Sequence, residues 1–248
     1  MSRALCIVMI LAVCTGFSSL TPEQLEFNQI SRIKDSDIAI KRFGELAEKS
    51  MTYSDMLLEL AARSTNNRIY LLNNQQKYAE SSEVAKAAIA RFEQHTDPHL
   101  RTVVAGLLLN QSSAMKNLGE NAAHLQLLER VISEYQDDEN AATQTLVALA
   151  LLDKVDAHVL AKDNVQARKV FEMFDERYMQ SGLYQSFDPK GLSTTCYVEE
   201  PCPPYAAGEH LLNPKFFEDR AKWYRNQFSS RSSKIIKPLI LNKGAKKN

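Results

Sequence analysis

The residues best suited to chemistry lie near the C-terminus, where Cys196 and Cys202 enclose a five-residue segment. Two cysteines this close pair readily in an oxidising compartment. A metal ion would need further ligands, and only Glu199, Glu200 and His210 stand nearby, so a disulfide is favoured over a metal site. The two adjacent carboxylates have no fixed mutual geometry on a loop and give only a weak signal for acid/base catalysis.

The other four histidines do not form a ligand set. His95 and His99 have i, i+4 spacing, but Asp97 lies between them and begins a helix with the following proline, so we interpret both as polar turn residues. His124 and His158 lie within helical segments, and we interpret them as packing or surface residues.

Other motifs of catalysis and cofactor binding are missing from the sequence. The acidic run 137–139 lacks the alternating ligand spacing of a calcium loop. There is no glycine-rich phosphate loop, nucleophile elbow or paired zinc motif. The sequence therefore predicts no catalytic residue, no cofactor and no metal, and favours a protein that is not an enzyme.

Aromatic residues gather in the C-terminal part, residues 181–248. The segment Ser181–Pro214 holds five of the eight prolines, and it is too aromatic for a flexible linker. Asn213-Pro214 then begins a helix whose aromatic stripe would either cap the preceding helices or face a partner. The candidate partner-binding residues of this part are Tyr184, Tyr197, Tyr205, Trp223 and Tyr224.

The tail, residues 231–248, carries six basic residues and no acid around an apolar centre. Three interpretations stay open for it: a strand added to a partner, contact with an anionic membrane surface, or a solvated tail. The formal net charge of the whole chain is zero, which argues against binding to nucleic acid.

The preceding residues, 19–180, have the composition of an all-α domain. Between Thr21 and Gln180 the only prolines are Pro22 and Pro98, and the run is rich in Ala, Leu, Gln, Glu and Lys. A short helix beginning at Thr21-Pro22 and a second at about 35–50 would cap the N-terminal end. The main helices are expected at about 54–74, 78–94, 98–118, 121–136, 140–161 and 165–180.

Two helix ends in this domain resemble each other. AIARFEQ and VISEYQD place Ile89 and Ile132 at matching positions, and likewise Phe92 and Tyr135, 43 residues apart. The match indicates a repeated unit in which these residues build the interior of a stack.

The second of these units is similar to a tetratricopeptide repeat. The segment 117–120, Asn-Leu-Gly-Glu, followed by an apolar stripe from Leu125 to Ile132, resembles the helix–turn–helix of that family. Ser112, Tyr78 and Ala167 fall where the family carries small or aromatic residues. The resemblance covers about residues 64–178, and it implies a right-handed α-solenoid of antiparallel helix pairs with a concave surface that binds a protein or peptide.

Several features depart from that family. The period is nearer 40 than the family's 34 residues, His124 replaces a small residue, and the register of the third unit is ambiguous. A related stack of helix pairs and an irregular bundle therefore stay open as alternatives.

Residues 1–18 have the pattern of a signal peptide. Arg3 precedes the apolar run Ala4–Cys14, and small residues follow. Eleven apolar residues are too few to span a bilayer as a helix. Lipid modification of Cys14 is an alternative that the preceding valine disfavours. We expect cleavage after Ser18 and a periplasmic or extracellular protein.

These features together lead to two hypotheses about function. The first is an exported scaffold that binds a protein or peptide partner, in envelope assembly or secretion. The alternative is a protein that binds or cleaves cell-wall polysaccharide with the aromatic loop 184–205, because aromatic faces stack on sugars.

Overall fold

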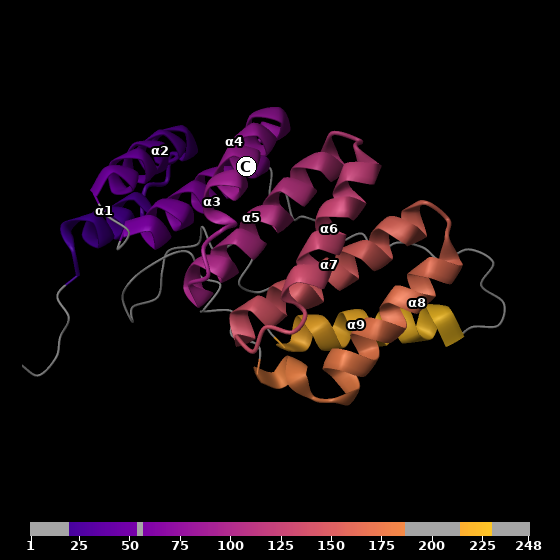
Figure 1. Ribbon diagram of the computed structural model, residues 1–248. Helices are drawn as coiled ribbons and strands as arrows, with labels where there is room; N and C mark the ends of the chain where they lie inside the picture. Colours follow the sequence, from indigo (N-terminus) through magenta and orange to yellow (C-terminus); the bar gives the residue numbers. More distant parts are fainter. Residues whose placement is uncertain (1–19, 54–56, 187–213, 230–248) are drawn as a thin grey trace, which may run out of the picture.

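The computed structural model describes residues 20–53, 57–186 and 214–229. In this part of the chain all regular structure is helical, which confirms the predicted all-α class (Figure 1). The α-helices are α1 Pro22–Ile30, α2 Ser36–Tyr53, α3 Leu58–Asn74, α4 Tyr78–Phe92, α5 Pro98–Asn117, α6 Asn121–Tyr135, α7 Ala141–Leu160, α8 Asn164–Phe174 and α9 Pro214–Ser229. A π-helical turn, Asp175–Gln180, continues α8, and a 3₁₀ turn, Leu183–Ser186, follows it.

Polar side chains begin several of these helices. Thr21 accepts a hydrogen bond from the Gln24 amide while the Gln24 side chain accepts one from the Thr21 amide, as the sequence predicts. Asp97 accepts from the Leu100 amide at 2.9 Å, and Asn140 caps α7 in the same way. Each cap satisfies amides that a helix leaves unpaired at its N-terminus.

The turns after α3, α5 and α7 have the same backbone geometry. Each contains one residue in the left-handed region, Gln76, Gly119 or Lys162, with φ of 61°, 81° and 61°. In each turn the next amide donates to the carbonyl five residues earlier, which satisfies the end of the helix. The three left-handed residues are 43 residues apart. The turns therefore repeat with the same 43-residue spacing as the matching helix ends, and Lys162 fixes the register of the third helix pair.

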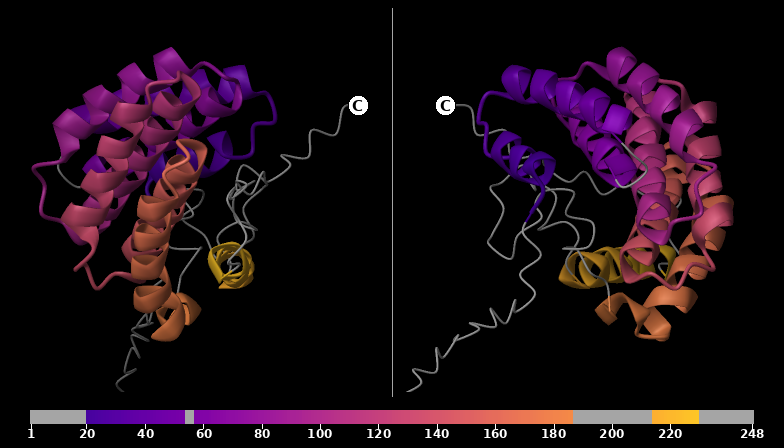
Figure 2. Two further views of the ribbon diagram at one scale, coloured as in Figure 1. Left: turned by 90° about the vertical axis from the view of Figure 1, so that its right-hand side faces the viewer. Right: turned by 60° about the vertical axis from the view of Figure 1, so that its left-hand side comes forward.

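Consecutive helices pack against each other in a curved row (Figures 1 and 2). Within it α3 also packs on α5, and α5 on α7, so these three form one layer while α4, α6 and α8 lie on its other side. We call the first layer the inner layer and the second the outer layer. The α9 helix lies on the inner side of the curve, beside α7 and α8 (Figure 2).

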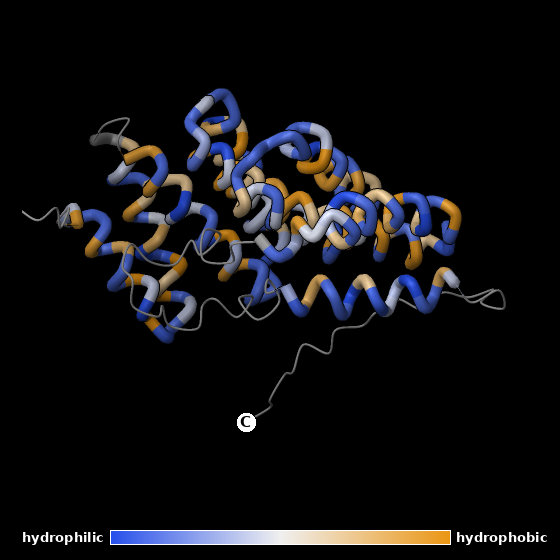
Figure 3. Tube along the Cα trace, turned by 90° about the horizontal axis from the view of Figure 1, so that it is seen from below, coloured by the Kyte–Doolittle hydropathy of each residue, from blue (hydrophilic) through white to orange (hydrophobic). Residues whose placement is uncertain are grey.

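The interior of the row is built from matching positions in successive pairs. Ile89 and Ile132 are buried, as are Phe92 and Tyr135, and Tyr178 continues the aromatic position 43 residues further on. Hydropathy alternates along the helices accordingly (Figure 3), and buried apolar residues from α3 to α9 form one core. The helices α1 and α2 form a smaller core with one side of α3, around Phe27 and Phe43.

Candidate functional site

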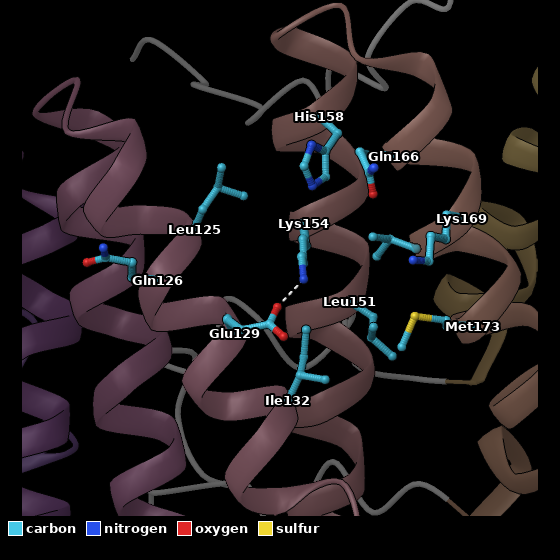
Figure 4. Close-up of a pocket in the computed structure, with 11 residues that line it drawn as sticks. Leu125, Gln126, Glu129, Ile132, Leu151, Lys154, His158, Gln166, Lys169 and Met173 are labelled. Carbon is cyan, nitrogen blue, oxygen red and sulfur yellow. Dashed lines mark hydrogen bonds and ion pairs between the residues drawn. The ribbon is translucent and has the colours of Figure 1, made fainter.

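A groove of about 490 Å³ opens between α6, α7 and α8 on the outer side of the row. We call it the outer groove. Its floor comes from α7, and its walls come from α6 on one side and α8 on the other (Figure 4). The lining residues are Leu125, Gln126, Glu129, Ile132, Leu151, Lys154, His158, Gln166, Lys169, Val170 and Met173.

The groove lies over one face of α7 that the outer helices leave uncovered. This helix is buried along most of its circumference, yet Lys154 and His158 are only partly buried. They are four positions apart, so they lie one turn from each other on the same face, above Leu151. The outer helices α6 and α8 leave this face open between them, and polar and charged side chains therefore stand beside apolar ones in the groove.

Charges in the groove are unequal. Lys154 donates to Glu129 across the groove, joining α7 to α6 (Figure 4). Lys169 extends from α8 toward the same space and makes no ion pair with any described residue. Burial lowers the pKa of His158, with Asp163 opposing and Lys154 reinforcing the shift, so the imidazole is neutral at pH 7. Two ammonium groups therefore face one carboxylate.

The groove has the composition of a binding site. None of its lining residues is a serine, threonine, cysteine or tyrosine that could act as a nucleophile. Among the described residues no cluster of three His, Cys, Asp or Glu could hold a metal ion. Its apolar walls and convergent charges are what a site for an amphipathic ligand requires.

One serine and one histidine elsewhere have the contact expected of a nucleophile and its base. The Ser112 hydroxyl lies 2.7 Å from His124 Nδ1, and Asp153 lies on the neighbouring helix α7. Ser112 and His124 are each 1% exposed, so a substrate cannot reach the hydroxyl. Burial also lowers the pKa of His124. We interpret the pair as part of the packing between α5 and α6, in agreement with the expectation for His124.

On the inner side, α9 is held to α7 by a buried polar cluster. Arg220 donates to Asp156 at 2.5 Å, and the Tyr224 hydroxyl donates to the same carboxylate. Phe171 of α8 contacts the rings of Tyr224 and Phe228. Burial raises the pKa of Tyr224, so its hydroxyl stays protonated and remains a donor. The aromatic stripe of α9 thus packs against the last helix pair.

The predicted partner-binding residues that the structure describes differ in their exposure and in their contacts. Tyr224 is 0% exposed, so its ring is part of the α9 contact and not of a partner-facing surface. Trp223 is partly exposed and packs edge-on against it. Tyr184 is also partly exposed, and its hydroxyl donates to Glu218 at 2.8 Å. No described geometry brings Tyr184 into the outer groove.

Other predicted features lie outside the described residues. They are Tyr197, Tyr205, Glu199, Glu200, the pair Cys196 and Cys202, the segment 1–18 and the tail 231–248. The disulfide, the signal peptide and most of the loop 184–205 therefore stay predictions, as does the polysaccharide hypothesis that depends on that loop.

Sequence reasoning missed the outer groove. It expected a working site on the concave surface, which is the free face of the first helix of each pair, or near Cys196 and Cys202, and it assigned His158 to packing or surface. The available signal was the pair Lys154 and His158, one turn apart in the most apolar of the described helices. Glu129 and Lys169 carry no such signal, because charged residues are ordinary on outer helices.

Comparison with models of protein families, with curated proteins and with solved structures finds no match. The fold and the groove therefore have to be interpreted from the chain itself. No helix within the described residues is long and apolar enough to cross a membrane.

Proposed function

We propose that the chain is an exported helical-repeat scaffold that binds a segment of a protein partner in the outer groove. The observation that carries the proposal is the groove itself, which is open, walled by apolar side chains and crossed by the Lys154–Glu129 ion pair. Binding sites of this size class, about 300–1,000 Å³, combine apolar walls with a few polar groups that orient the ligand.

The repeat interpretation rests on the equal spacing of the three turns. Hydrogen bonds recur at the same offsets: the amides of Lys77, Glu120 and Asp163 each donate to the carbonyl five residues earlier. A stack of equal helix pairs, here interpreted as a right-handed α-solenoid similar to tetratricopeptide repeats, buries one face of each pair and leaves long surfaces for partners. That architecture suits a scaffold.

Export is the second part of the proposal, and it rests on residues 1–18 alone. Their single basic residue, apolar run and small residues fit a secretory signal. The proposal predicts a mature chain that begins at Ser19. N-terminal sequencing of the protein recovered from the exported fraction would test this, and an intact N-terminus in the cytoplasmic fraction would contradict it.

Site-specific crosslinking in cells tests the binding function. A photoreactive residue is placed at Gln126 or Met173, which are exposed on opposite walls of the groove, and in a control at Val165, which is 77% exposed outside it. We expect the same partner to be captured from both groove positions and not from Val165. Leu125→Arg, which places a long charged side chain on the α6 wall, should abolish that adduct while the circular dichroism spectrum keeps its helical form. Adducts that do not depend on position would contradict the proposal.

A further inference from the structure

The charge and shape of the outer groove narrow the chemistry of its ligand. Lys154 has Glu129 as a partner, whereas Lys169 has none among the described residues, and both ammonium groups come from helices that border the same space. Lys169 is exposed, and an apolar ligand that covered it would take its ammonium group out of water without a counter-charge, which is costly. A ligand carboxylate between Lys154 and Lys169 removes that cost.

The groove also has a direction. His158 and Gln166 lie at one end, while Ile132, Leu151 and Met173 lie at the other (Figure 4). A ligand that fits both ends carries an acidic or polar group at one end and apolar side chains at the other. Along α6, α7 and α8 the lining residues recur every three or four positions over about two turns, or roughly 10 Å.

A helix presents side chains with that same spacing, so its apolar stripe and a carboxylate one turn away would meet the two ends together. We propose that the outer groove binds an amphipathic helix of a partner protein that carries Asp or Glu one turn from its apolar residues. This proposal rests on the binding function proposed above and specifies the class of partner.

The chain's own tail does not have this chemistry. Residues 231–248 carry six basic residues and no acid, so they would add like charge beside Lys154 and Lys169. The α9 helix cannot reach the groove while it stays in place, because it is fixed to Asp156. Asp156 and Lys154 are two residues apart, about 200° around α7, and therefore lie on opposite faces.

A peptide selection with the full-length protein tests the proposal. The probe is a displayed library of 16-residue, helix-favouring peptides, with variable positions that allow Leu, Ala, Glu, Lys and Gln. We expect the enriched peptides to combine an apolar stripe with a Glu four positions before or after one of its apolar residues. Lys should be depleted at that position. Enrichment of neutral or basic peptides that bind in the groove would overturn the further inference and leave the binding function standing.

Two variants locate the binding of the enriched peptides. K154Q/H158M gives α7 the residues that stand 43 positions earlier on α5, Gln111 and Met115, and should weaken binding about tenfold. The reciprocal variant Q111K/M115H alters the neighbouring helix pair and should leave the affinity unchanged. If K154Q/H158M binds as the parent does, or if no peptide is enriched, the binding function of the groove falls as well.

Reversing the charge of Lys169 should give the protein a preference for basic peptides. A misfolded variant would not show this preference. K169E should weaken acidic peptides about fivefold to tenfold and strengthen their Lys-substituted twins by a similar factor. Both changes should shrink as salt is raised from 50 to 500 mM. Equal affinity of K169E for the two peptides would contradict a carboxylate at this position.

Discussion

The second helix pair, α5 with α6, and the third, α7 with α8, share a backbone but differ in their partly exposed side chains. On the outer side, the positions of Lys154 and His158 on α7 are occupied by Gln111 and Met115 on α5. On the inner side, Asp156 of α7 stands where α5 has Ser113. Ionisable side chains thus stand on both faces of α7, and they are missing at the matching positions of α5.

The outer walls differ in the same way. Arg130 of α6 donates to Glu93 at 2.9 Å, just past the end of α4, and so joins the outer helices of the first two pairs. The matching position on α8 is Met173, which is 46% exposed and makes no such connection. An ion pair thus joins the outer helices α4 and α6, whereas among the described residues no ion pair joins α6 to α8, and the pair Lys154–Glu129 joins the floor to one wall. The shared backbone therefore sets where a groove lies, whereas the side chains decide whether it can accept a ligand.

The largest expected difference between the two pairs is at the inner positions. Asp156→Ala leaves Arg220 buried without its carboxylate, so the free energy of unfolding should fall by about 3–5 kcal/mol. Ser113→Ala should change it by less than about 0.5 kcal/mol. Urea unfolding followed by circular dichroism measures both. A loss in Asp156→Ala as small as that expected for Ser113→Ala would mean that α9 does not depend on Asp156.

The next difference concerns Asp153, whose counterpart on α5 is Asn110. Burial raises the pKa of Asp153, and Asp156 adds to the shift. A carboxyl whose pKa is higher in the folded than in the unfolded state stabilises the fold fully below its unfolded pKa, about 3.9, and loses that contribution as pH rises through the folded pKa.

Asp153→Asn copies the second pair and removes this dependence. Relative to the parent, the variant should gain stability between pH 4 and pH 7, by less than the loss at Asp156 because Asp153 is only partly buried. Urea unfolding at the two pH values checks this. A difference from the parent that is the same at pH 4 and pH 7 would show that the pKa of Asp153 is the same in the folded and the unfolded chain.

The turns give a smaller effect of opposite sign in the two pairs. Gly119→Ala should cost about 1 kcal/mol, because φ is 81° there and a Cβ meets nothing else within 4 Å. Lys162→Gly should gain about 0.5–1 kcal/mol, because lysine holds a left-handed conformation that glycine adopts freely. Thermal and urea unfolding measure both. A loss in Lys162→Gly would indicate that the lysine side chain has a stabilising contact.

The smallest expected effect is at the groove itself. Glu129→Gln removes an ion pair whose carboxylate is 57% exposed, and it should change the free energy of unfolding by less than about 0.5 kcal/mol. The same variant should bind acidic peptides more tightly, because it frees Lys154. A large loss of stability would assign the ion pair to the fold and not to the ligand.

Local signals in the sequence predicted the helices well. Thr21 with Gln24, and Asp97 before a proline, show a helix start within four residues, and both starts are present. The turn positions were harder, because only Gly119 of the three left-handed residues is a glycine. Gln76 and Lys162 have the same conformation without that signal, and the register of the third helix pair was therefore left ambiguous.

The groove depends on relationships that a single helix does not carry. Glu129, Lys154 and Lys169 come together because α6 and α8 stand apart over α7, which is a property of packing. From the sequence, the aromatic stripe of α9 would either cap the preceding helices or face a partner. It did not indicate that Tyr224 would face Asp156 while Trp223 stays at the surface, because that depends on how α9 is rotated.

The equal spacing of the turns has a consequence for the length of the molecule. Removing residues 98–140 would join Asp97 directly to Ala141, so that one helix-capping residue takes the place of another, Asn140. The joint would leave every remaining turn at its usual distance from the next. A chain built this way can be shortened or extended by whole helix pairs through deletion or duplication of its coding sequence, and its reach can change without a new fold.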